Sequence, residues 1–96
     1  MSISPPLTLR RILLIDDDVD LALMLREYLE PGQIELTLAH NSAKGLPLAM
    51  QDCFDLVLLD LMLPDGNGLD LLRRLRQHSR RPVIMFTAPV SYTHLR

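Results

Sequence analysis

Two short apolar segments of this chain end in carboxylates, and they constrain its fold more than any other feature. Residues 12–15 are isoleucine or leucine and lead into three consecutive aspartates at 16–18, while residues 56–59 lead into Asp60. Continuous apolar runs of this length are typical of strands in a parallel sheet that helices cover on both faces. In open sheets of that kind, ligands bind at the carboxyl ends of the strands. The sequence therefore predicts that both acidic groups lie at one crevice.

Segments with strand character alternate with segments of helical periodicity, a pattern that predicts βαβ units in a parallel sheet. Apolar residues, Met24 and Tyr28 among them, recur at helical spacing within residues 19–29, and Asp18 stands where an N-cap is expected. A turn-rich segment, residues 61–68, is expected to be a surface loop at the crevice. The expected strands are residues 11–15, 34–39, 56–60 and 82–87, and two further helices are expected after Asn41 or Ser42 and around Leu69, Leu72 and Leu75.

The bulk composition excludes several classes of protein. With 96 residues the chain is long enough for one small domain, and its net charge of −2 argues against a dedicated nucleic-acid binder, which carries a basic excess. Cys53 is the only cysteine, so an internal disulfide is excluded. No apolar stretch approaches the roughly 20 residues that span a bilayer, and no secretion signal is recognisable. We expect a cytoplasmic domain, without membrane contact, preceded by a flexible leader at residues 1–9.

The acidic groups together indicate a site for a cation or a phosphate. Crowded carboxylates repel one another, so the arrangement is tolerated when a proton, a cation or a transferred group relieves the repulsion. Mg2+ prefers oxygen ligands, and an aspartate beside it can act as a nucleophile that forms an acyl phosphate. Asp16, Asp17 and Asp60 supply such carboxylates. Thr87, at the end of the expected fourth strand, adds a hydroxyl that can donate a hydrogen bond to a phosphoryl oxygen.

Three segments of the chain resemble the receiver domains of two-component response regulators. They are ILLIDDD at residues 12–18, DLVLLDLMLPDGNG at residues 55–68 and PVIMFTA at residues 82–88, in the order and at the approximate spacing of that family. The resemblance implies an α/β fold of the flavodoxin-like type, a doubly wound parallel sheet with strand order 2-1-3-4. It also implies a signalling phosphoacceptor, which catalyses only its own phosphorylation and dephosphorylation.

The resemblance assigns a role to five positions. Asp60 is similar to the residue that a sensor histidine kinase phosphorylates. Asp16 and Asp17 are similar to the acidic pair that holds Mg2+ together with the phosphoacceptor. Met62 would offer its backbone carbonyl to the metal, and Thr87 is similar to the switch hydroxyl that moves toward the phosphoryl group.

The last part of the chain departs from the family. Receiver domains have a fifth strand that ends in a lysine, followed by a last helix, and we expect both to be missing here. The only lysine, Lys44, lies in the expected second helix. We therefore expect a partial receiver domain at residues 10–88 and a tail at residues 89–96 that is foreign to the family. The fourth strand would then be an exposed apolar edge, which predicts low stability or self-association.

Two alternatives remain open at the level of the sequence. The first is a receiver-like interaction module that is not phosphorylated, or an inactive fragment, which the absence of the family lysine favours. The second is a phosphatase of the haloacid-dehalogenase-like type, in which Asp16 would be the nucleophile and Asp18 a second acid, although Asp60 would then have no role. Asp18 is more simply a helix cap.

Overall fold

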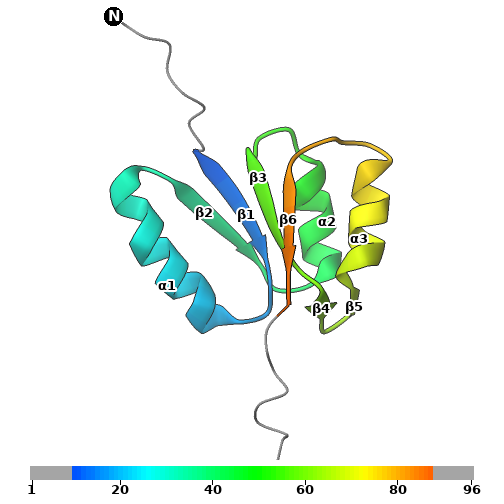
Figure 1. The fold of residues 1–96 in the computed structure, drawn as a ribbon, viewed down its shortest axis with the longest axis horizontal. Helices are drawn as coiled ribbons and strands as arrows, with labels where there is room; N and C mark the ends of the chain where they lie inside the picture. Colours follow the sequence, from blue (N-terminus) through cyan, green and yellow to red (C-terminus); the bar gives the residue numbers. More distant parts are fainter. Residues whose placement is uncertain (1–9, 88–96) are drawn as a thin grey trace, which may run out of the picture.

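Figure 1 shows the computed structural model of the chain, which describes residues 10–87. Four parallel strands form one sheet in the order β2-β1-β3-β6, and a short antiparallel pair forms a second sheet. The leader and the tail expected from the sequence lie outside the described residues. The elements are β1 (Arg11–Ile15), α1 (Val19–Leu29), a 3-10 turn (Glu30–Gly32), β2 (Glu35–Ala39), α2 (Ser42–Met50), β3 (Leu56–Asp60), β4 (Met62–Leu63), β5 (Gly66–Asn67), α3 (Gly68–Arg76) and β6 (Val83–Phe86).

Helices lie on both faces of the sheet, with α1 on one face and α2 and α3 on the other (Figure 1). This arrangement confirms the doubly wound parallel fold, and β6 takes the place of the expected fourth strand at one edge of the sheet. Self-association through that edge stays a prediction. Among residues 10–87, no helix is long and apolar enough to cross a membrane.

The apolar run in β1 is explained by burial on both faces of the sheet. Ile12 and Leu14 pack with Ala22 of α1, whereas Leu13 and Ile15 contribute to the larger core beneath α2 and α3. Successive side chains of a strand point to opposite faces, so a central strand between two helical layers needs apolar residues at every position. This requirement produces the unbroken hydrophobic run that the sequence displays.

The helical faces differ in part from those expected. In α1 the buried face centres on Ala22, and Tyr28 is 81% exposed, so its inclusion in the apolar pattern did not indicate burial. Met24 is exposed as well. In α3 the core contacts come from Leu71 and Leu75, while Leu69 points to solvent. Of the predicted face, Leu75 is buried and Leu72 packs against the core, whereas Leu69 is exposed and Leu71, which was not predicted, is buried instead.

Smaller differences concern the ends of elements. β2 begins one residue later than expected, at Glu35, and β6 covers Val83–Phe86 instead of residues 82–87. The expected surface loop at residues 61–68 contains the two-residue strands β4 and β5, joined as a hairpin, and α3 already begins at Gly68. This hairpin turns the chain within a few residues of the acidic edge.

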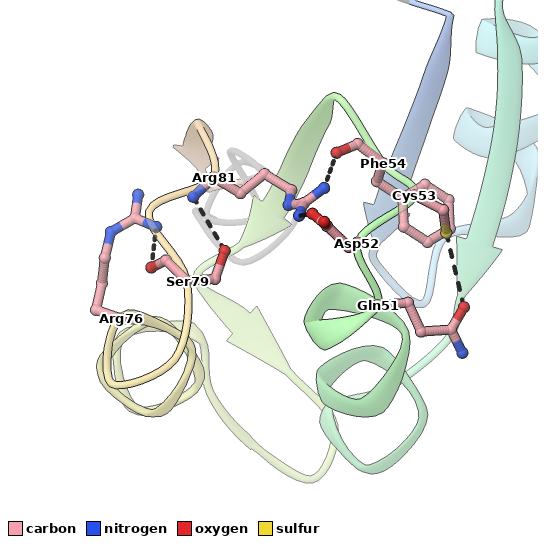
Figure 2. Close-up of polar contacts among 7 residues, drawn as sticks. All are labelled: Gln51, Asp52, Cys53, Phe54, Arg76, Ser79 and Arg81. Atoms are coloured by element: carbon pink, nitrogen blue, oxygen red, sulfur yellow. Dashed lines mark hydrogen bonds and ion pairs between the residues drawn. The ribbon is translucent and has the colours of Figure 1, made fainter.

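An arginine holds two loops together at the amino ends of the strands. Arg81 is mostly buried and pairs through Nη2 with Asp52 at 2.5 Å, while its Nη1 donates a hydrogen bond to the carbonyl of Phe54 (Figure 2). The backbone N–H of Arg81 donates to Ser79 Oγ at 3.1 Å. Arg81 therefore joins the segment before β6 to the segment before β3.

We expect Arg81→Met to lower the free energy of unfolding by about 1–3 kcal/mol, because the partly buried Phe54 carbonyl loses its donor. The measurement is urea denaturation of the wild type and the variant. Asp52→Ala is the matched control: it removes the ion pair but keeps the hydrogen bond from Arg81 to the Phe54 carbonyl, so its loss of stability should be clearly smaller. Equal losses in the two variants would contradict this account.

Candidate metal centre

The predicted acidic residues meet at the carboxyl edge of β1 and β3. In the parallel register Ile15 lies opposite Leu59, so Asp16 and Asp60, the next residue of each segment, reach the edge side by side. Asp16, Asp17 and Asp60 each offer a carboxylate oxygen, and these oxygens lie within 4.8 Å of one another. The sequence prediction that the two acidic groups share one site is therefore correct in geometry.

Two of the three carboxylates are buried. Asp16 is 3% exposed and Asp60 is 4% exposed, whereas Asp17 is open to solvent. Burial of like charges at this separation is costly unless an opposite charge or a proton compensates. The arrangement combines hard oxygen donors with one accessible side, which matches the preference of Mg2+ or Ca2+.

Backbone N–H groups orient the two buried carboxylates. Asp16 Oδ1 accepts a hydrogen bond from the N–H of Asp18 at 3.0 Å, and Asp60 Oδ1 accepts one from the N–H of Met62 at 3.1 Å. Among residues 10–87, the second oxygen of each carboxylate accepts no hydrogen bond from the protein. Each acid is thus held in place by one oxygen while the other remains available to a ligand.

The pKa of Asp16 is raised from 3.8 to about 6. The largest cause is burial, which disfavours the charged form, and the nearby carboxylates of Asp60 and Asp17 add to it. The hydrogen bond from Asp18 N–H acts in the opposite direction without cancelling the effect. The folded chain therefore carries an electrostatic cost at neutral pH that a bound cation would remove.

The raised pKa of Asp16 makes the free energy of unfolding depend on pH. The folded state holds the Asp16 proton more tightly than the unfolded state, so this contribution to stability is present below pH 3.8 and is lost as the pH rises through about 6. Asp16→Asn removes the charge and keeps an oxygen for the Asp18 N–H. We expect it to raise the free energy of unfolding at pH 7.5 by about 1–3 kcal/mol in metal-free buffer.

Urea denaturation at pH 4.5 and 7.5 measures the effect, and the gain in Asp16→Asn should be much smaller at the lower pH. Asp52→Asn is the control, because Asp52 is exposed and far from the acidic edge in the fold. A gain for Asp16→Asn that is equal at both pH values would show that ionisation of Asp16 in its buried position is not the cause.

The other predicted residues take different positions around the acids. Met62 lies in β4 with an exposed side chain, and only its backbone N–H is recorded in contact with Asp60. Thr87 is exposed and follows β6, whose Phe86 is in register with Asp60. Lys44 lies in the first turn of α2. Asp18 caps α1 by accepting the N–H of Leu21 at 3.0 Å, as predicted.

A close backbone approach fixes the end of the hairpin beside Asp60. Gly68 N–H donates to the Leu61 carbonyl at 2.8 Å, and Leu61 N–H donates to the Phe86 carbonyl at 2.8 Å. A Cβ on Gly68 would overlap the Asp60 carbonyl oxygen and lie 3.0 Å from Leu61 Cα. Gly68 belongs to the turn-rich segment at residues 61–68, but its packing requirement follows only from the three-dimensional contact.

We expect Gly68→Ala to destabilise the fold by about 1–3 kcal/mol, because backbone atoms must shift to admit the methyl group. In an open helix position the same change would stabilise by up to about 1 kcal/mol. Gly66→Ala serves as the control, since a Cβ there meets nothing within 4 Å. Urea denaturation of both variants decides the point, and an unchanged midpoint for Gly68→Ala would contradict it.

Comparison with known proteins finds similarity to response regulators. The family model for the response regulator receiver domain matches residues 12–95. The transcriptional regulatory protein CpxR of Escherichia coli (strain K12) is 45% identical over 80 residues, which are 83% of this chain and 34% of CpxR. The chain spans about a third of the length of the curated relatives it matches. The matched range extends beyond residue 88. The predicted boundary between the receiver domain and the tail at residues 89–96 lies at the limit of the described residues and stays a prediction.

Solved structures of similar proteins share the fold. The non-phosphorylated HemR receiver domain from Leptospira biflexa superposes with a TM-score of 0.76 at 36% identity, over 88% of this chain and 68% of that one. A response regulator protein from Burkholderia pseudomallei, solved with a phosphorylated aspartic acid, a calcium ion and citrate, superposes with a TM-score of 0.73 at 28% identity. That match covers 88% of this chain and 50% of the other.

Proposed function

Because this chain belongs to the response regulator receiver domain family, we propose that Asp60 accepts a phosphoryl group from a sensor histidine kinase at a site that binds Mg2+. The observation that carries the proposal is the cluster of Asp16, Asp17 and Asp60 oxygens within 4.8 Å at one edge of the sheet. A phosphoacceptor needs a positioned carboxylate, and a metal site beside it needs further oxygen donors.

The residues present fit a divalent cation. Asp16, Asp17 and Asp60 would hold Mg2+, and the backbone carbonyl of Met62 would complete the protein ligands. When bound, Mg2+ supplies positive charge against the carboxylates and the incoming phosphoryl oxygens. The raised pKa of Asp16 supports this assignment, because an added positive charge would lower the electrostatic cost of the buried carboxylate.

The chemistry assigned to Asp60 is an in-line transfer. A carboxylate oxygen of Asp60 attacks the phosphorus of the kinase phosphohistidine, the P–N bond breaks, and the electron pair leaves with the imidazole nitrogen. An acyl phosphate forms on Asp60, and attack by water later restores the carboxylate and releases inorganic phosphate. The hydrogen bond from Met62 N–H to Asp60 Oδ1 orients the side chain, and the carboxylate oxygen that does not hold the metal would be the nucleophile.

Thr87 is the proposed switch residue. It is exposed and follows β6 at the strand end beside Asp60, because Phe86 is in register with Asp60. Its hydroxyl would donate a hydrogen bond to a phosphoryl oxygen on Asp60. This contact would link phosphorylation of Asp60 to the position of the segment after β6.

A similar protein supports the chemistry. The Burkholderia pseudomallei response regulator described above contains a phosphorylated aspartic acid and a calcium ion, a cation with the same preference for oxygen ligands as Mg2+. The phosphatase alternative is disfavoured, because its second acid, Asp18, caps α1 through the N–H of Leu21 and is not among the clustered carboxylates. A receiver-like module without phosphorylation is the remaining alternative.

We expect the protein, incubated with acetyl phosphate and Mg2+, to gain one phosphoryl group that hydroxylamine removes. Intact-mass spectrometry measures the adduct. Asp60→Asn should abolish it because the nucleophilic oxygen is replaced by an amide, and EDTA should suppress it in the wild type.

Asp52→Asn is the matched control. It removes an exposed aspartate near the amino ends of the strands, whereas Asp60 lies at their carboxyl ends, and the variant should keep the adduct. Circular dichroism establishes that each sample is folded. Folded wild type that remains unmodified would exclude the phosphoacceptor role and favour the module without phosphorylation. An adduct that persists in Asp60→Asn would place the reaction at another residue.

A further inference from the structure

The helix α2 has a sequence that is unfavourable for a helix. It spans nine residues, with Gly45 and Pro47 in its interior. Glycine costs about 1 kcal/mol relative to alanine in a helix, and proline cannot donate the hydrogen bond that its position requires. Gly45 is needed, because a Cβ there would approach the side chain of Ile15 to 2.8 Å. A helix of this kind depends strongly on how its ends are satisfied.

The N-terminus of α2 is capped from two places in the sequence. Asn41, which directly precedes the helix, accepts the N–H of Lys44 at 2.9 Å. The carboxylate of Asp65 accepts the N–H of Ser42 at 2.7 Å and that of Ala43 at 2.9 Å, one with each oxygen. The two backbone hydrogen bonds hold the pKa of Asp65 below its ordinary value. A negative charge also interacts favourably with the dipole of a helix at this end.

Asp65 does not belong to α2 but to the hairpin that follows Asp60. It lies between β4 and β5, at the tip of residues 61–67, which we call the acceptor loop. The base of the acceptor loop touches the site, because Met62 N–H donates to Asp60 Oδ1 and Gly68 N–H closes onto the Leu61 carbonyl. The loop is therefore held at one end by the acidic site and at the other by the first turn of α2.

We propose that Asp65 is a positioning residue that fixes the acceptor loop to α2 and so places Met62 against Asp60. Where it concerns Mg2+, this inference rests on the proposed function. Asp65 touches neither Asp60 nor the other clustered acids, and it acts through the backbone of the loop. Ordering of the acceptor loop and ordering of the first turn of α2 are thermodynamically coupled, and this coupling is reciprocal. A metal that orders the acceptor loop therefore also stabilises the first turn of α2.

The test compares Asp65→Ala with Asn41→Ala in the 96-residue chain. Both variants remove hydrogen-bond acceptors from the same helix end, but only Asp65→Ala releases the acceptor loop. Two readouts are taken well below the unfolding temperature: the Mg2+ dissociation constant by titration, and the hydrogen exchange rate of the Met62 amide by NMR without metal. Asp65→Asn is the conservative variant, because it keeps one acceptor oxygen and the side-chain shape.

We expect Asp65→Ala to weaken Mg2+ binding by about tenfold, as is common for residues that orient metal ligands. It should also accelerate exchange of the Met62 amide severalfold. Asn41→Ala should have a clearly smaller effect on both quantities, because it weakens the helix end without removing the contact to the loop, and Asp65→Asn should fall between the wild type and Asp65→Ala. Asp65→Asn separates the loss of charge from the loss of the contact, so the order of the three variants distinguishes release of the loop from a weaker helix cap.

An unchanged Met62 exchange rate in Asp65→Ala would overturn the inference, as would equal effects of Asp65→Ala and Asn41→Ala on either readout. If the wild type fails to bind Mg2+, the metal part of the proposed function is wrong. The Met62 exchange rate in the two alanine variants then decides the role of Asp65 by itself, because that measurement needs no metal.

Discussion

The two-sided burial of β1 is the constraint on which the rest of this structure depends. Leu13, Leu14 and Ile15 are fully buried, and β1 pairs with β2 on one side and with β3 on the other. A strand in this position has no freedom of register, because a slip by one residue would exchange the side chains of its two faces. The same register carries Asp16 to the place where β3 delivers Asp60. The hydrophobic core thus determines where the charged site forms.

The site concentrates negative charge and holds it with neutral groups. The buried carboxylates of Asp16 and Asp60 are oriented by backbone N–H groups, and no arginine or lysine pairs with either of them among residues 10–87. Burial, with a smaller contribution from the neighbouring carboxylates, raises the pKa of Asp16. An arrangement of this kind is destabilising for the fold in isolation and favourable for a cation or a proton, which is a common property of functional sites. Stability and proposed function therefore oppose one another at these residues.

At both ends of the parallel strands, side chains bind backbone groups of loops that are distant in the sequence and so hold these loops together. At the amino edge, Arg81 ties the segments before β3 and β6, and Asp55 accepts the N–H groups of Arg10 and Arg11. At the carboxyl edge, Asp65 ties the acceptor loop to α2. Each of these side chains satisfies backbone groups that a short strand or helix leaves unpaired at its end. Short elements can be rigid in this fold because their ends are satisfied by distant residues.

The sequence by itself determined the features that depend on local patterns. The apolar runs predicted β1 and β3, the strand-end acids predicted the position of Asp16, Asp17 and Asp60, and the place of Asp18 before a helix predicted its cap. These succeed because strand burial and helix capping act over a few residues. Periodicity was less reliable for helix faces: it predicted Leu72 and Leu75 of α3 correctly but chose Leu69 in place of Leu71, because neighbouring positions on a helix differ by only about 100° and the packing of the helix on the sheet decides between them.

Only the tertiary structure decided which distant groups come into contact. Asp65 lies more than twenty residues from the N–H groups that it caps, and Gly68 is required because its helix starts against the Asp60 carbonyl. Such contacts depend on how α2, α3 and the acceptor loop pack on the sheet, and that packing is set by the whole core. A linear sequence records the residue types suited to these contacts, but the partners are assigned only when the elements assemble.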